Sequence, residues 1–153
     1  MPAPRIAGWI VAACALALAA CPGRSPGPAP LDTRNDACAH CRMAVSNARF
    51  ASQVVAPGAE PRFFDDLGCL RGWLARRGGL PPRAVAFVAD HRTRAWVRAG
   101  AATYTRVLAL ETPMSSHLVA HADAASRDAD REAAGGTPVA AAEILGSEGA
   151  EAR

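Results

Sequence analysis

Apolar and polar residues alternate in two short stretches of the chain, RMAVS (42–46) and FASQVVA (50–56), which are separated by NAR. A repeat of two is typical of β-strands that bury one face. The pattern therefore predicts a hairpin of two short strands. A third apolar stretch, AVAFVAD (84–90), predicts another strand further along the chain.

The stretch DDLGCLRGWLARRGG (65–79) has a helical rather than an alternating pattern. Asp65 or Asp66 can cap the start of this helix, and the Gly-Gly pair that closes the stretch can end it. Its apolar residues fall on one face: Leu67, Leu70 and Leu74, with Trp73 beside them. The first half of the chain thus predicts the order strand, strand, helix, strand.

The second half has weaker patterns. RAWVRA (94–99), TYTRVLAL (103–110) and SHLVAHAD (116–123) resemble strands, ASRDADREAA (125–134) predicts a polar helix, and PVAAAEIL (138–145) predicts a last strand. This half also ends in strand, helix, strand, so an internal duplication is possible, although no residue-level repeat demonstrates it.

The N-terminus has the features of an export signal. Residues 1–20 combine one arginine with a short, alanine-rich apolar run that ends in small residues before Cys21. This arrangement resembles a bacterial lipobox, which predicts lipidation of Cys21; the alternative is an ordinary cleavage site beside a cysteine. Pro22 after the cysteine resembles outer-membrane sorting. Residues 21–36 read as a Pro/Gly-rich tether and 146–153 as a disordered tail.

The charge of the chain excludes some partners. The formal charge of +3 falls by one when Arg5 leaves with the signal, and so small a charge favours neither nucleic acid nor an electrostatic membrane surface. No Ser/His/Asp order and no phosphate-binding glycine loop is present. We therefore expect a binding protein rather than an enzyme.

The stretch NDACAHCRMAV (35–45) carries the main candidate chemistry. Haem attachment would need histidine where Arg42 stands, structural zinc needs four ligands, and a redox pair would precede a helix. Two interpretations stay open. Cys38 and Cys41 can form a short disulfide, as in many exported proteins. Alternatively, Cys41 and Met43 point to one side of a strand and bind copper(I), which soft sulfur ligands select.

A distant methionine bears on this choice. After Met1 is removed with the signal, only Met43 and Met114 remain, and Met114 lies in a proline-marked loop, ETPMSSH. Ordinary packing is one explanation for Met114. Its position in such a loop makes a site shared with Cys41 more plausible.

Other candidate residues receive more conservative interpretations. Cys69 is expected to be a buried, inert thiol, and Asp65 with Asp66 a helix cap rather than a catalytic pair. His117 could complete a copper site near Met114. The remaining histidines are His121, on a strand, and His40 and His91, expected at the surface.

Four motifs in order, after a lipobox, resemble the NosL family of lipoproteins encoded with nitrous oxide reductase and associated with its copper supply. They are CAHCRMAV, PRFFDDLGCLRGWL, AFVAD followed by RAWVRAGAATY, and TPMSSH. The resemblance implies an α+β fold of two related strand-strand-helix-strand modules, about 37–91 and 92–145. Family members often have glycine at the position of Arg42.

The resemblance also implies one copper(I) ion held by Cys41, Met43 and Met114, with a less certain part for Cys38. The expected function is a lipid-anchored, periplasm-facing copper chaperone, more plausibly on the outer membrane. Its expected partner is nitrous oxide reductase or the membrane-associated maturation machinery of that enzyme. The alternative is a disulfide-containing or thiol-redox lipoprotein without a metal role.

Overall fold

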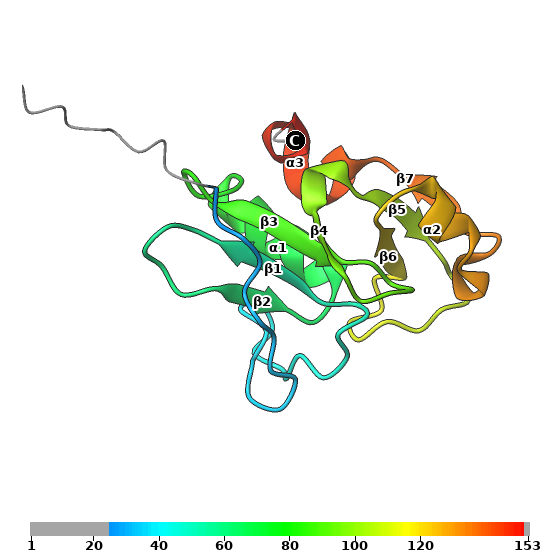
Figure 1. Ribbon diagram of the computed structural model, residues 1–153, viewed down its shortest axis with the longest axis horizontal. Coiled ribbons are helices and arrows are strands. Elements are labelled where there is room, and N and C mark those ends of the chain that lie inside the picture. Colours follow the sequence, from blue (N-terminus) through cyan, green and yellow to red (C-terminus); the bar gives the residue numbers. More distant parts are fainter. Residues whose placement is uncertain (1–24, 152–153) are drawn as a thin grey trace, which may run out of the picture.

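The computed structural model describes residues 25–151, which form an α+β fold with two antiparallel sheets (Figure 1). The first sheet has the strand order β2-β1-β3-β4 and the second β6-β5-β7. In chain order the elements are β1 (Ser52–Val55), β2 (Arg62–Phe64), α1 (Leu67–Arg77), β3 (Val85–Ala89), β4 (Trp96–Arg98), the 3-10 turn η1 (Ala99–Ala101), β5 (Thr103–Arg106), β6 (Leu118–His121), α2 (Ala124–Asp128), the 3-10 turn η2 (Arg131–Ala133), β7 (Thr137–Val139) and α3 (Ala141–Glu151).

The order strand, strand, helix, strand occurs twice. It consists of β1, β2, α1 and β3 in the first half and of β5, β6, α2 and β7 in the second. In both halves the first strand lies in the middle, flanked by the other two in antiparallel pairs. Because β4 extends the first sheet, the first half continues to Arg98 rather than ending near residue 91.

The helix α1 confirms the prediction made from its sequence. The Asp66 carboxylate accepts a hydrogen bond from the Gly68 N–H, and Gly78 ends the helix with φ 74°. Glycine is favoured there because it adopts a positive φ without steric cost. Of the two aspartates considered as caps, Asp66 is therefore the one that caps.

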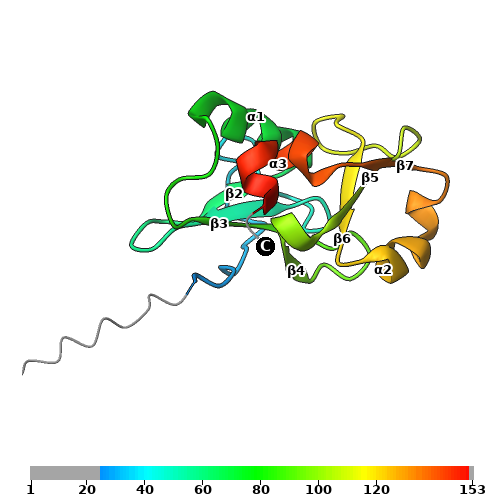
Figure 2. The ribbon, with the colours of Figure 1, turned by 90° about the horizontal axis from the view of Figure 1, so that it is seen from above.

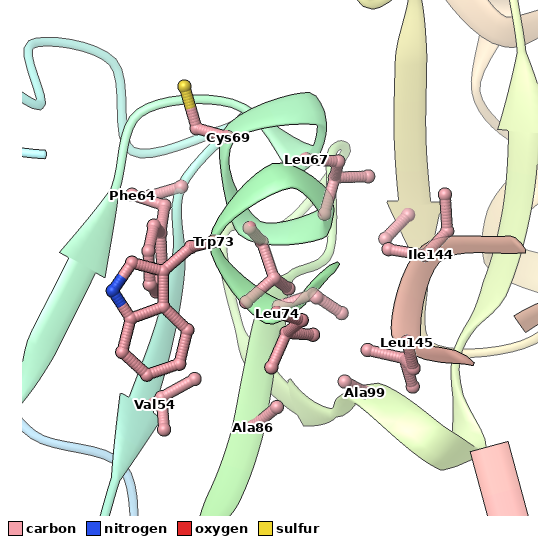
Figure 3. Close-up of a cluster of buried hydrophobic side chains, with 14 of the residues drawn as sticks. Val54, Phe64, Leu67, Cys69, Trp73, Leu74, Ala86, Ala99, Ile144 and Leu145 are labelled. Atoms are coloured by element: carbon pink, nitrogen blue, oxygen red, sulfur yellow. The ribbon is translucent and has the colours of Figure 1, made fainter. Parts of the chain in front are cut away.

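The main core lies between the first sheet and two helices, α1 and α3, which lie side by side on one face of that sheet (Figure 2). Ile144 and Leu145 of α3 point toward Leu74 and Ala99, and all four side chains are buried (Figure 3). Burial of a large aliphatic side chain contributes about 1.5–3 kcal/mol, so these contacts hold the C-terminal helix on the first module.

This helix corrects two expectations. The stretch 138–145 is not one strand: the strand ends at Val139, and the alanine-rich residues after it are helical. The helix continues to Glu151 through a kink at Gly146, so residues 146–151 are not a disordered tail. Alanine is the strongest helix former, and its run outweighs the alternating pattern.

A further correction concerns residues 42–46, which form no strand. An isolated bridge joins Ala44 to Ala37, and Arg42 has a left-handed backbone with φ 71°. One left-handed residue turns the chain away from an extended path. In the hairpin, β1 pairs instead with the strand that follows it, β2, which the sequence analysis did not predict.

The segment expected to be a tether is partly packed on the domain. The Ala29 N–H donates to Gln53 Oε1 at 2.8 Å, and Gln53 Nε2 donates back to the Ala29 carbonyl at 3.1 Å. Leu31 packs against the main core. The predicted signal (1–20) and Cys21 lie outside the described residues. Among residues 25–151, no helix has the length and apolar character needed to span a membrane.

One buried carboxylate, Asp90 after β3, joins the two halves. Its Oδ2 accepts hydrogen bonds from the Ala122 N–H at 2.8 Å and the Ser126 hydroxyl at 2.7 Å, both in the second half. Burial by itself would raise the pKa of Asp90, but hydrogen bonds from Ser126, Ala122 and Thr93 outweigh it and hold the pKa below its usual range.

We expect Asp90→Ala to lower the free energy of unfolding by about 2–3 kcal/mol, because the buried Ser126 hydroxyl and the Ala122 N–H lose their charged acceptor. A carboxyl group whose pKa is lower in the folded chain stabilises the fold above its unfolded pKa of about 4, and this contribution disappears as the pH falls. Chemical unfolding at pH 7 and pH 3.5 should therefore show a large difference between wild type and variant at pH 7 and a smaller one at pH 3.5. The exposed Asp128→Ala is the matched control, and equal stability of wild type and Asp90→Ala at pH 7 would refute this role.

Candidate metal centre

Three cysteines and one aspartate converge where β2 meets α1. The donor atoms of Cys38, Cys41, Asp65 and Cys69 all lie within 4.8 Å of one another. Cys38 and Cys41 come from the loop before β1, Asp65 follows β2, and Cys69 lies in the first turns of α1. All three are free thiols in the described part of the chain. The structure thus gathers a set of donors that can hold a metal ion.

The loop that carries Cys38 and Cys41 is closed by backbone hydrogen bonds. The Cys38 N–H donates to the Met43 carbonyl at 2.7 Å, and the Arg42 N–H donates to the Cys38 carbonyl at 3.0 Å. The left-handed conformation of Arg42 closes this turn, and glycine would adopt it with less strain. Cys41 and Met43 are therefore presented by a tight loop, not by the extended strand that the sequence suggested.

Asp65 is part of the cluster rather than a helix cap. Its side chain is buried, and the Cys41 Sγ lies 3.6 Å from each of its carboxylate oxygens. Cys69 lies four residues further along, in the first turn of α1. The sequence analysis considered Asp65 only as a cap or a catalytic residue, and for Cys69 it favoured a buried, inert thiol over a ligand. The short spacing of carboxylate and thiol in FDDLGC was the available signal.

The three thiols differ in burial and acidity. Burial raises the pKa of Cys38, and burial together with Asp65 and Cys38 raises that of Cys69 far above its usual range. Both are therefore neutral thiols at pH 7 when no metal is bound. Cys41 is the half-buried member of the group, and it is the thiol that an incoming ion or reagent reaches first.

The two methionines lie on loops that meet at the same pair of aspartates. Met43 and Asp65 line one shallow cavity together with Thr112 and Pro113. The Met114 N–H donates to Asp66 Oδ2 at 3.0 Å, and the Thr112 hydroxyl donates to the same oxygen at 2.7 Å. Met43 is 56% exposed and Met114 41% exposed. The fold thus brings the loop of Thr112, Pro113 and Met114, here called the TPM loop, next to the group of three cysteines and Asp65, here called the cysteine cluster. Both thioethers remain accessible.

The positions of the histidines confirm one prediction, His121 on a strand, and differ from others. His117 Nδ1 lies 2.9 Å from the Leu110 carbonyl within its own loop. His40 is half-buried, and burial and Arg76 lower its pKa. His91, expected at the surface, is completely buried, because the second half of the chain covers it. His121 is also completely buried.

Comparison of the chain with protein-family models, with curated proteins and with solved structures gave no match. The geometry of the described residues is therefore the basis of the functional proposal below.

The cluster predicts a clear order of thiol reactivity. With iodoacetamide at pH 8, we expect Cys41 to be alkylated at least about tenfold faster than Cys38 or Cys69, because exposure and thiolate content control the reaction. Mass spectrometry of tryptic peptides at timed intervals measures the three rates. In guanidinium chloride the three rates should become similar. Equal rates in the folded protein would show that this packing of the cluster is wrong.

Proposed function

We propose that this chain is a NosL-like, lipid-anchored copper chaperone that binds one copper(I) ion through Cys41, Met43 and Met114. The observation that carries the proposal is that a half-buried thiol lies in a cluster of free thiols beside the two loops that hold the mature chain's methionines. A thiolate with thioethers is a soft donor set, and such sets select copper(I) over zinc or magnesium.

Exposure of the methionines supports transfer rather than storage. When the thioethers of a site reach solvent, a ligand from a partner protein can bind the ion before the site's own ligands release it. The ion therefore never becomes free. The proposed recipient is nitrous oxide reductase or its membrane-associated maturation machinery. Lipidation of Cys21 would hold the chain at the membrane, facing the periplasm.

The alternative is a thiol-redox or disulfide-containing lipoprotein. The sulfur atoms of Cys38 and Cys41 lie within 4.8 Å of each other, so a small movement would let them form a bond. This alternative predicts that copper binding, if any, does not depend on either methionine.

A copper(I) titration against a chromophoric chelator tests the proposal on the reduced full chain in detergent. We expect one tight equivalent in the wild type. Cys41→Ser and the double variant Met43→Leu with Met114→Leu should each weaken it at least about tenfold, which corresponds to about 1.4 kcal/mol. Leu108→Ala removes another exposed apolar side chain and is the control expected to leave affinity unchanged.

Binding that is unaffected by both methionine changes would refute the proposed ligand set. A Cys38–Cys41 disulfide in protein taken from the periplasm, together with such unchanged binding, would favour the redox alternative. A preference for zinc(II) over copper(I) in the same titration would contradict the proposed cargo.

Asp66 is expected to act as a positioning residue that touches no metal. It accepts hydrogen bonds from Gly68 at the start of α1 and from Thr112 and Met114 in the TPM loop. Asp66→Ala should release this loop and lower copper(I) affinity several-fold, although no donor atom is lost. Asp123→Ala removes the corresponding cap of α2 and should leave copper affinity unchanged. Unchanged affinity in Asp66→Ala would show that the loop is placed by other contacts.

A further inference from the structure

A second group of potential ligands lies where the two halves of the molecule meet. The donor atoms of His91, His121 and Asp130 all lie within 4.8 Å of one another. Asp130 Oδ2 is 2.6 Å from His91 Nδ1 and 3.0 Å from His121 Nε2. Both histidines are completely buried and the aspartate is 6% exposed. The proposed copper function does not use any of these residues.

The group lies where the two halves of the chain meet. His91 follows β3 in the first half, whereas His121 ends β6 and Asp130 follows α2 in the second half. The His91 N–H donates to the Ala120 carbonyl at 2.8 Å, so a backbone hydrogen bond joins the halves beside the group. The contact between the halves therefore brings the two rings and the carboxylate together.

Two buried nitrogen atoms are left without hydrogen-bond partners among the described residues. When both rings donate to Asp130, His91 Nε2 and His121 Nδ1 face no donor. Buried polar atoms without partners are rare, because each loses its interactions with water. These orphan atoms show that hydrogen bonding within the chain does not satisfy both rings.

A metal ion would give the two rings a different role. If His91 Nδ1, His121 Nε2 and Asp130 Oδ2 bind an ion, each neutral ring keeps one proton, which moves to its other nitrogen. The proton on His91 Nε2 then points toward Glu132 Oε2, 3.7 Å away. A carboxylate that accepts the outer N–H of a ligating histidine is a common feature of metal sites. No proton is gained or lost in this change.

The charged groups around the two rings partly balance. Asp130 places a buried carboxylate between the rings. Arg49 Nη2 lies 3.5 Å from His91 Nδ1, and the same nitrogen is paired with Glu132 Oε2 at 2.5 Å. The Glu132 carboxylate therefore offsets the guanidinium charge next to His91.

We propose that His91, His121 and Asp130 form a second metal site, which binds a divalent transition ion of the zinc(II) class. Two imidazoles and one carboxylate are borderline-to-hard donors that suit zinc(II), in contrast to the sulfur cluster. A surface cavity reaches Asp130, one of the three proposed ligands.

Cobalt(II), a spectroscopic substitute for zinc(II), distinguishes this site from the cysteine cluster. In the reduced full chain in detergent, cobalt(II) at the histidine site should give d–d absorption without a thiolate-to-cobalt charge-transfer band. Asp130→Asn should remove this component and one equivalent of cobalt(II), and leave any thiolate band unchanged. Asp123→Asn, which replaces a nearby carboxylate outside the group, is the matched control and should bind as the wild type does.

A measurement on the wild type does not depend on how well a variant folds. Zinc(II) should shift the side-chain ¹⁵N resonances of His91 and His121, with the larger change at Nδ1 of His91 and Nε2 of His121. Unchanged resonances at two equivalents of zinc(II) would overturn the proposal and leave the group as a structural hydrogen-bond network. Cobalt(II) binding that Asp130→Asn does not alter would overturn it as well. Neither result bears on copper(I) at Cys41, so the two proposals fail separately.

Discussion

The Asp65-Asp66 pair between β2 and α1 is the constraint on which the rest of the site depends. Asp66 caps α1 and accepts two hydrogen bonds from the TPM loop, so one carboxylate sets both the helix start and the position of Met114. Asp65 points the other way, into the thiols of the cysteine cluster. Adjacent residues on an extended turn face opposite sides, and this simple property joins two segments that lie far apart in the sequence.

The proposed copper site draws on both halves of the chain. The first module supplies the cysteine loop and α1, and the second supplies the TPM loop. Asp90 bonds to the start of α2, while α3 returns from the second module to pack on α1. These two connections are independent, one polar and one apolar. Together they hold the two sheets in a fixed relation, which a site shared between loops requires.

The two groups of potential ligands differ in chemistry and in exposure. Cys38, Cys41, Asp65 and Cys69 form a sulfur-rich, partly open cluster, whereas His91, His121 and Asp130 form a closed, nitrogen-rich one where the two halves meet. Under the two proposals, the open cluster passes on a soft ion and the closed cluster retains a borderline one.

The amino-acid sequence by itself determined the α+β class and α1 with its cap, because these depend on local propensity and spacing. It did not reveal that Arg42 breaks the strand, that Asp65 and Cys69 join the cysteines, or that His91 is buried. Those features depend on contacts between residues far apart in the chain. Periodicity reports which face of an element is apolar, but only packing decides which elements meet.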